Sequence, residues 1–567
     1  MHPQLFLRAG FGLLTGAWSV LAWSATLAVC PRDAASSESQ PVLQLLAESP
    51  TESWVVSWRS DNLPPTPGAC AELRLPVDAS AVRWSTLLAS DDPVLAAKAL
   101  ALQGTARGPA VDVSEIFSLP LEPSPAAAPL MAPPNSPNLA WRAFGREERA
   151  KVEPTGRLVC APGQAPAGFT ARLPTGSSRD RKVLRVIARG QGAFQVGLSD
   201  PKRLAEEAPQ MLGTLTANKA WHVHEFALSE QRADWAAASL ACPDTATALE
   251  IQSLSLHSGR QQRAAWLWSP ELWQNTPEKI WAWTAAHNLN TVMVTVPVAN
   301  GQVADAPGLR RFLSEATRRQ VAVWAVAGDP RDVLPASQPA LRERLAAYRD
   351  FNRAAGADMQ LAGVQLDIEP YLLPGYRLNP KAWRDAYLAT VRAAREQVGS
   401  GLALDMVVPV WWGTDRHWGA GWLDAMVAAN VSLTVMNYRT ADEALRRGAE
   451  PFLAWGSRHK RQVTVALEVG PIADETQWRF LRTQDRGELW ALPLGRHTAL
   501  VLFNRPVSEL RGTAWQYQTS QAFSGGHITF AGAPDRLNAS AHRLLPAWSA
   551  WEGFRGIAIH GLDAAPQ

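Results

Sequence analysis

Hydrophobic and polar positions follow a repeating strand and helix pattern in the C-terminal half of the chain. Near-continuous apolar runs occupy 264–268, 291–296, 321–326, 363–367, 403–408, 431–436, 463–467 and 556–559. Amphipathic stretches of helical length lie between them, the clearest at 277–287, 309–319 and 341–355. Apolar strands separated by such helices are typical of a parallel sheet covered by helices. Eight such units predict a (β/α)8 TIM barrel over 262–567.

The stretch 470–553 is longer than one connection of such a barrel requires. We expect it to be an insertion before the last helix. It should contain more than one helix, and the run His527 to Phe530 has the composition of a further strand.

Residues 139–258 alternate with a period of two. The alternating runs are 182–189, 193–198, 221–226 and 249–254. Short strands between turn residues predict a jelly-roll-like β-sandwich, which resembles in style the modules that accompany polysaccharide-active enzymes. A carbohydrate-binding module and a purely structural sandwich are equal alternatives.

The N-terminal region divides into three segments. Arg8, an apolar run and small residues after it predict a signal peptide over 1–24, and hence a secreted or periplasmic protein. Residues 25–118 carry alternating runs that predict a small β-rich domain, and the Pro/Ala-rich stretch 119–138 predicts a linker. The fold class is therefore α/β, with a C-terminal TIM barrel behind two β-rich domains.

The cysteines indicate two disulfides in an oxidising compartment. Chain order favours Cys30 with Cys70 and Cys160 with Cys242. A lipid anchor at Cys30 is disfavoured, since Val29 stands where a small residue is usual. No later run approaches the ~20 apolar residues of a membrane span. We expect no metal site and no cofactor, because neither a CxxC pair nor a histidine cluster occurs.

Composition and charge limit the classes of binding partner that we expect. The formal net charge of +3 is small for 567 residues and does not indicate a nucleic-acid partner. The chain has 25 Trp against 6 Tyr, and sugar rings stack on flat aromatic faces, although most single Trp residues fill cores. We therefore expect a polysaccharide or oligosaccharide as substrate.

Reactive groups of a TIM barrel lie at the C-terminal ends of its strands. The fourth strand ends in Asp367 and Glu369, whose spacing directs both carboxylates to one side, where each raises the pKa of the other. Glycosidic cleavage requires a proton donor and a group that stabilises the cationic sugar, and this pair can supply both. An isolated D-x-E is otherwise more often a strand cap or an ion-pair partner.

The other strand ends supply the remaining candidates. Tyr438 and Glu468 are the further catalytic candidates. The candidates for substrate binding are Trp266, Trp268, Tyr371, Trp411, Trp412, Asn437, Arg439 and His560. Trp411 and Trp412 are adjacent and face opposite ways, so only one can line a cleft. His560 is equally well explained as a structural histidine, and Glu468 as a sugar ligand or a partner of Arg439.

Two segments resemble motifs of glycoside hydrolase family 18. Leu361 to Glu369, LAGVQLDIE, resembles the DGxDxDxE strand, and Met436 to Arg439, MNYR, resembles MxYD on the sixth strand. The resemblance implies that Glu369 is the general acid and that Asp367 and Tyr438 hold a substrate acetamido group acting as internal nucleophile. Ala362, Gln365 and Arg439 stand where the family has Asp, so fewer carboxylates support Asp367 than in that family.

Three alternatives to this mechanism stay open. In a retaining glycosidase, Glu369 would be acid/base and Glu468 the nucleophile, although Ile368 stands where that clan usually has Asn. The missing Asp residues favour a non-catalytic carbohydrate-binding protein on a degenerate barrel. A structural role in assembly of the cell envelope is the third alternative.

Overall fold

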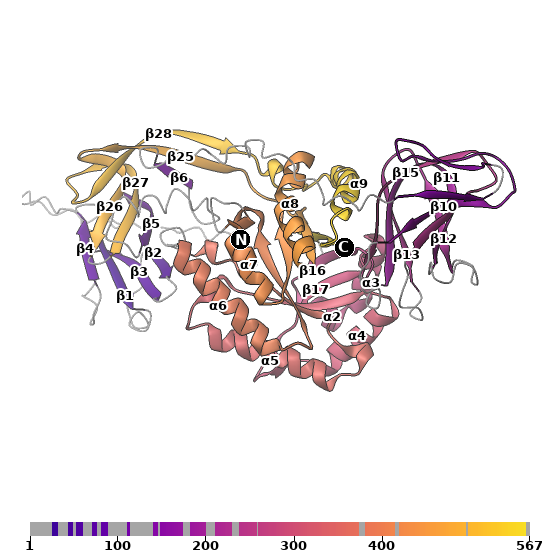
Figure 1. The fold of residues 1–567 in the computed structure, drawn as a ribbon. Helices are drawn as coiled ribbons and strands as arrows, with labels where there is room; N and C mark the ends of the chain where they lie inside the picture. The colour runs from indigo at the N-terminus through magenta and orange to yellow at the C-terminus, as the bar shows by residue number, and fades with distance from the viewer. Residues whose placement is uncertain are drawn as a thin grey trace, which may run out of the picture.

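Eight parallel strands close into a barrel in the C-terminal half of the chain (Figure 1). The computed structural model describes residues 140–145, 148–173, 182–199, 210–228, 237–257, 259–373, 380–413, 419–494 and 497–562, and the strand paths 25–31, 43–48, 53–60, 71–75, 81–88 and 110–113. β16 pairs with both β17 and β29, which closes the ring. The predicted TIM barrel is confirmed.

The barrel strands follow the predicted order along the chain. They are β16 (Gln262–Leu267), β17 (Thr291–Thr295), β20 (Ala322–Ala327), β21 (Gly363–Leu366), β22 (Ala403–Pro409), β23 (Ser432–Met436), β24 (Val463–Glu468) and β29 (Phe554–His560). The helices around them are α2 (Pro270–Asn275), α3 (Pro277–Ala286), α4 (Ala306–Arg318), α5 (Gln338–Ala354), α6 (Pro380–Val398), α7 (Gly419–Ala428), α8 (Asp442–His459) and α9 (Pro534–Ser549). The clearest predicted helices therefore begin and end within a few residues of α3, α4 and α5.

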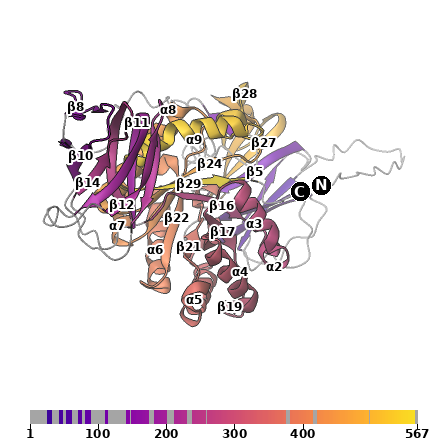
Figure 2. The ribbon, with the colours of Figure 1, turned by 90° about the vertical axis from the view of Figure 1, so that its right-hand side faces the viewer.

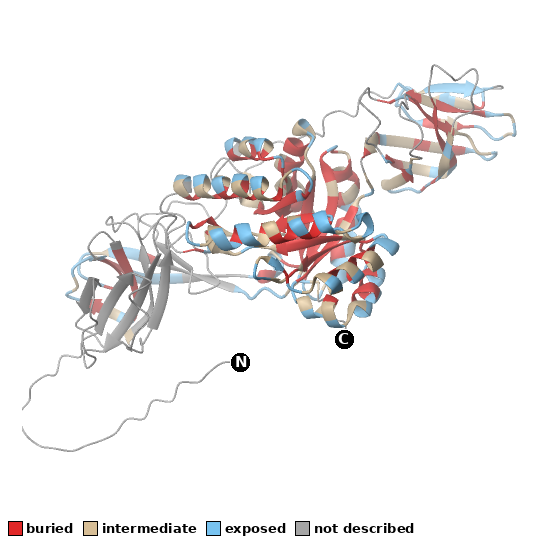
Figure 3. Cartoon of the chain, turned by 90° about the horizontal axis from the view of Figure 1, so that it is seen from below, coloured by how far each residue is buried: buried red, intermediate tan, exposed pale blue. Residues whose placement is uncertain are grey.

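Successive residues of each barrel strand face opposite sides, and the two sides form separate cores. Outward-facing residues such as Val364, Leu366 and Ile368 pack with the helices in the largest apolar cluster. Inward-facing residues such as Trp266 and Trp324 form a smaller cluster inside the barrel. Figure 3 shows the buried residues along the strands and on the helix faces that cover them.

The insertion after β24 differs from the prediction. Residues 470–553 contain four strands, β25 (Glu475–Thr483), β26 (Arg486–Leu494), β27 (His497–Ser508) and β28 (Thr513–Phe523), and among described residues α9 is their one α-helix. The expected strand 527–530 is wrong. Gly525–His527 form a 3-10 turn capped by Ser524, and the Phe530 N–H donates to the Glu468 carbonyl (2.9 Å).

The inserted strands share a sheet with the N-terminal region. β5 (Val82–Leu88) pairs with β27 and β6 (Ala110–Val113) with β25, so one six-stranded sheet joins segments far apart in the sequence. A second sheet contains β1 (Ala25–Pro31), β2 (Leu43–Glu48), β3 (Ser53–Ser60) and β4 (Ala71–Leu75). The predicted signal peptide, the predicted linker 119–138 and the predicted Cys30 to Cys70 disulfide lie outside the described side chains.

An antiparallel β-sandwich precedes the barrel. Its strands are β7 (Arg142–Gly145), β8 (Ala150–Val152), β9 (Leu158–Cys160), β10 (Ala167–Arg172), β11 (Val183–Ser199), β12 (Gln210–Ala217), β13 (His222–Ala227), β14 (Ala237–Ala241) and β15 (Thr247–His257). The predicted runs 182–189 and 193–198 are one strand, β11. Gly190 and Gly192 adopt positive φ and lie so close to β15 that neither position has room for a Cβ. The chain therefore bends here without leaving the sheet.

The sandwich contacts the barrel at the beginnings of the barrel strands. Arg185 pairs with Glu225 (2.9 Å), and the same carboxylate accepts the Gln261 N–H just before β16. Arg185 also reaches the carbonyl of Phe554, the first residue of β29 (3.5 Å). Helix α9 contacts β13 beside this group, and Figure 2 shows one end of α9 next to the sandwich. The sandwich therefore lies at the end of the barrel where the strands begin, opposite their C-terminal ends.

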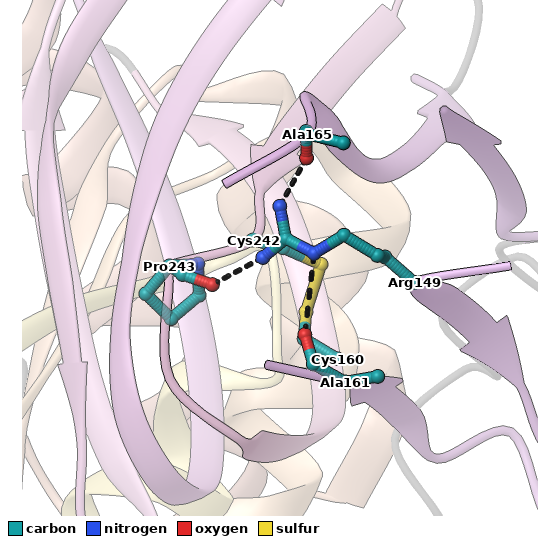
Figure 4. The surroundings of a disulfide bond; sticks show 6 residues. All are labelled: Arg149, Cys160, Ala161, Ala165, Cys242 and Pro243. Atoms are coloured by element: carbon teal, nitrogen blue, oxygen red, sulfur yellow. Dashed lines mark hydrogen bonds between the residues drawn. A yellow bond between two sulfur atoms is a disulfide. The ribbon is translucent and has the colours of Figure 1, made fainter. Parts of the chain in front are cut away.

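The predicted disulfide between Cys160 and Cys242 is confirmed, with a Cα to Cα distance of 5.8 Å. The Arg149 guanidinium lies beside it and donates to the carbonyls of Ala161, Ala165 and Pro243 (Figure 4). One cross-link and one guanidinium thus tie together three loops at the same edge of the sandwich.

We expect the double substitution Cys160→Ala/Cys242→Ala to destabilise the sandwich by about 4 kcal/mol. The two residues are 82 apart in sequence, and opening so long a loop returns conformational freedom to the unfolded chain. Calorimetry should show the sandwich transition at lower temperature while the barrel transition stays in place. An unchanged sandwich transition would contradict the prediction.

Candidate functional site

A buried polar network fills the barrel beneath the end of β21. Trp266 donates its indole N–H to Gln365 (2.7 Å), and the Gln365 amide donates to Asp405 (2.8 Å). Thr434 donates to the same Asp405 oxygen (2.6 Å). Gln365 stands where the family 18 motif has Asp, and here its amide bridges an indole and a carboxylate, which an ionised Asp could not do.

Asp367 and Glu369 extend from β21 toward the mouth of the barrel. Ile368, between them, is buried in the outer core, so the two carboxylates face inward. The Asp367 N–H donates to the Ala327 carbonyl (2.8 Å), which continues the pairing with β20. Its Oδ1 atom is buried and accepts no hydrogen bond from the described residues. Glu369 accepts a hydrogen bond from the Tyr371 hydroxyl.

Burial disfavours the charged forms of both carboxylates. It raises the pKa of Asp367 to about 8, with a further rise from the Glu369 charge and an opposing effect from His560. Burial also raises the pKa of Glu369, while the Tyr371 hydrogen bond and His560 lower it. Both shifts favour the protonated forms of the two carboxyls.

Glu468 and His560 meet at the ends of the adjacent strands β24 and β29. Glu468 Oε2 lies 2.7 Å from His560 Nδ1, and Oε1 accepts the Gly470 N–H (2.6 Å). Arg439, one of the alternative partners considered for Glu468, donates to the Tyr438 carbonyl (2.8 Å).

Tyr438 connects the two groups of carboxylates. Its ring lies against that of His560, with centroids 6.0 Å apart, and packs on the inner core. Burial and the charges of Glu468, Asp367 and Glu369 raise the pKa of Tyr438 well above its ordinary value. Its hydroxyl thus stays protonated and able to donate.

The aromatic candidates separate into exposed and buried groups. Trp268 is 46% exposed at the end of β16, with its ring centroid 6.0 Å from that of His560. Trp411 is half-buried and contacts Tyr371 edge to face (5.2 Å). Trp266 is buried and its N–H is committed to Gln365, so it supports the site without offering a sugar an open face.

Two predicted substrate contacts are not available in this structure. Trp412 is fully buried against Tyr387 and Trp422 in the outer core. The expected opposite orientation of Trp411 and Trp412 on a strand end is wrong, because both lie in the 3-10 turn Val410–Gly413 and their rings meet edge to face (5.9 Å). Asn437 is also fully buried, and its amide donates to the Leu445 carbonyl (2.6 Å). Both side chains hold helices against the barrel.

Sequence reasoning missed two residues that shape the site. Gly328 follows β20 with a φ of +150°, and a Cβ there would lie 2.0 Å from the Asp367 carbonyl oxygen. A glycine directly after the third strand was the available signal. Asp405 carries a buried carboxylate below Asp367, but its position inside an apolar strand gave no indication of its partners.

Neither a cluster of metal-ligating side chains nor a membrane-spanning helix is found in the described parts of the chain. Over these residues, His, Cys, Asp and Glu form no cluster suited to a metal ion. The helices described are all too short or too polar to cross a bilayer.

Comparison with known proteins gives structural likeness at very low identity. The sequence matches no protein-family model and no curated protein. A xylanase 10C from Cellvibrio japonicus in complex with xylopentaose is 10% identical, with a TM-score of 0.26 over 59% of this chain and 78% of that chain. A Clostridium thermocellum endo-1,4-β-D-xylanase 10B, its family 22 carbohydrate-binding and family 10 glycoside hydrolase modules complexed with xylohexaose, is 8% identical, with a TM-score of 0.29 over 74% and 86%.

A family 29 carbohydrate-binding module is 13% identical, with a TM-score of 0.18 over 23% of this chain and 90% of that chain. TM-scores this low carry no argument, so the fold rests on the closed ring of parallel strands itself. The resemblance to glycoside hydrolase family 18 is not confirmed.

We expect Asp367→Asn to stabilise the protein at alkaline pH relative to the wild type. The folded-state pKa of Asp367, about 8, lies above its unfolded value, so the stability from its neutral form is complete in acid and lost as pH rises toward 8. The variant cannot ionise and should gain on the order of 4 kcal/mol over the wild type between pH 5 and pH 8.5, since about 1.4 kcal/mol accrues for each pH unit up to 8.

Thermal unfolding at the two pH values measures this difference. Asp358→Asn, at an exposed position of the same barrel, is the matched control. An equal shift of melting temperature at both pH values for Asp367→Asn would show that the carboxyl is not buried as described.

Proposed function

We propose that this protein is a glycoside hydrolase that cleaves a polysaccharide, with Glu369 as the general acid and Asp367 and Tyr438 assisting. The observation that carries the proposal is the pair of inward-facing carboxylates at the barrel mouth, both with raised pKa. Glycosidic cleavage requires a proton donor at neutral pH and a second carboxylate beside it. We further propose a secreted or periplasmic location, supported by the predicted signal peptide and the Cys160 to Cys242 disulfide.

In the proposed reaction, Glu369 donates its proton to the glycosidic oxygen as the bond to the anomeric carbon breaks. An acetamido oxygen of the substrate attacks that carbon, and Asp367 stabilises the positive charge that develops on the ring so formed. Tyr438, neutral because of its raised pKa, donates a hydrogen bond to the same group. Water then opens the ring and returns a proton to Glu369.

Trp268 and Tyr371 are the aromatic groups best suited to hold the sugar chain. Trp268 is exposed at the end of β16 and Tyr371 bonds directly to the acid Glu369. Trp268 follows β16 and Tyr371 follows β21, the strand that also carries the acid pair, which supports a groove across the mouth.

The substitution Glu369→Gln should reduce kcat by about 10²–10⁴-fold, because an amide cannot protonate the leaving oxygen. Release of reducing ends from a panel of polysaccharides, including N-acetylated ones, measures the effect. Glu396→Gln, on an exposed site of α6, is the matched control and should retain full activity. Unchanged cleavage by Glu369→Gln would refute the assignment. Saturable glycan binding by the wild type without any cleavage would favour the non-catalytic carbohydrate-binding alternative.

Substrate assistance and a protein nucleophile predict different inhibitors. A stable thiazoline analogue of the cyclised acetamido sugar should inhibit competitively, because it occupies the site as the internal intermediate would. Both carboxylate oxygens of Glu468 already have partners, which favours a supporting role over a nucleophilic one. Labelling of Glu468 by an activated 2-fluoro glycoside, detected by mass spectrometry, would instead establish Glu468 as a protein nucleophile.

A further inference from the structure

Tyr371 contacts the acid Glu369 from the turn that follows β21. Pro370–Leu372 form a 3-10 turn, in which the Leu372 N–H donates to the Glu369 carbonyl (3.0 Å). Pro370 restricts the backbone at the first position of this turn and is itself buried. The turn brings the Tyr371 side chain back toward the residue two positions earlier, and its hydroxyl donates to Glu369 Oε1.

Aromatic contacts hold the Tyr371 ring in place. It meets Trp411 and Trp412 edge to face, at centroid distances of 5.2 and 6.1 Å. Trp412 is fully buried, and its carbonyl accepts the Trp422 indole N–H (2.8 Å). The turn after β22 therefore supports the side chain that bonds to the acid. The ring packing and the hydrogen bond are separate contacts, so a Phe at this position would keep the first and lose the second.

The Tyr371 hydroxyl distinguishes the two oxygens of the Glu369 carboxyl. Oε1 accepts this hydroxyl, whereas Oε2 accepts no hydrogen bond from the described residues. Burial and the Glu369 charge raise the pKa of Tyr371 well above its ordinary value, so the hydroxyl stays a donor. In a neutral carboxyl one oxygen carries the proton and the other is the better acceptor. A donor fixed on Oε1 therefore leaves the proton on Oε2.

We propose that Tyr371 is a positioning residue that fixes the catalytic proton on Oε2 of Glu369 and stabilises the carboxylate formed when that proton leaves. The inference rests on the proposed function, since it assigns how the acid of that site is oriented. As the glycosidic bond breaks, the Oε2–H bond breaks too; its proton goes to the glycosidic oxygen and its electron pair stays on the carboxylate. The Tyr371 hydrogen bond then becomes charge-assisted and about twice as strong. It therefore stabilises the transition state more than the ground state.

The other titratable groups that face Glu369 come from three strand ends. They are Asp367 after β21, Tyr438 after β23 and His560 on β29. The 3-10 turn Pro330–Val333 packs against the turn of Tyr371. Its charged groups bond to one another, because Arg331 pairs with Asp329 (3.1 Å) and Asp332 accepts the Asp329 N–H (3.0 Å). Within the described residues, Tyr371 is the member of this set that hydrogen-bonds to the Glu369 carboxyl.

The substitution Tyr371→Phe should lower kcat by about 10-fold and leave KM nearly unchanged, because the ring stays and the hydroxyl is lost. The high-pH limb of the kcat/KM profile should move upward by about one pH unit. The reason is that loss of a donor to the charged form raises the pKa of Glu369. Tyr371→Leu also removes the ring and should raise KM as well. An unchanged kcat in Tyr371→Phe, or a lower kcat without movement of the limb, would overturn the proposal.

Tyr517→Phe, at an exposed position of β28, is the matched control and should leave kcat and the profile unchanged. Titration of the Glu369 carboxyl carbon by NMR in the full-length protein tests the same inference without substrate. We expect its midpoint to rise in Tyr371→Phe, and an unchanged midpoint would contradict the proposal. If the wild type cleaves no polysaccharide, the proposed function fails, whereas the titration still decides whether the Tyr371 hydroxyl acts on Glu369.

Discussion

The alternation of inward and outward residues in a closed barrel is the constraint on which the site depends. Once eight parallel strands form a ring, every second residue of a strand must face the interior. Asp367 and Glu369 share a side for this reason, and Ile368 is sent to the outer core. Alternation ends with the strand: Trp411 and Trp412 lie beyond β22 in the 3-10 turn Val410–Gly413, where the first is half-buried and the second fully buried.

The layer below the acid pair is polar, whereas barrel interiors are mostly filled by branched apolar side chains. Burial of Gln365, Asp405 and Thr434 is tolerable because they hydrogen-bond one another and Trp266. Arg555 lies over the Trp324 ring and faces the Asp405 charge from the start of β29. A layer bonded in this way holds β21 in register, although Asp405 Oδ1 accepts no hydrogen bond from the described residues.

The accessory parts attach to opposite ends of the barrel. Arg185 and Glu225 hold the sandwich at the strand beginnings, far from the acid pair along each strand. The insertion containing β25–β28 leaves directly after Glu468 and returns at Phe530, whose N–H bonds to Glu468. The sheet that these strands share with β5 and β6 is therefore joined to the barrel on the side of its mouth, whereas the sandwich is joined at the opposite end (Figure 1).

The sequence by itself determined the barrel, its strand order, the Cys160 to Cys242 disulfide and the shared side of Asp367 and Glu369, because these follow from local periodicity and chain order. Local pattern cannot report contacts between distant segments. The pairing of β5 and β6 with inserted strands, the choice of His560 over Arg439 as the partner of Glu468, and the close approach of Gly328 to Asp367 were decided by the tertiary structure alone. Each depends on distances across the closed ring or between sheets, which exist only after the chain has folded.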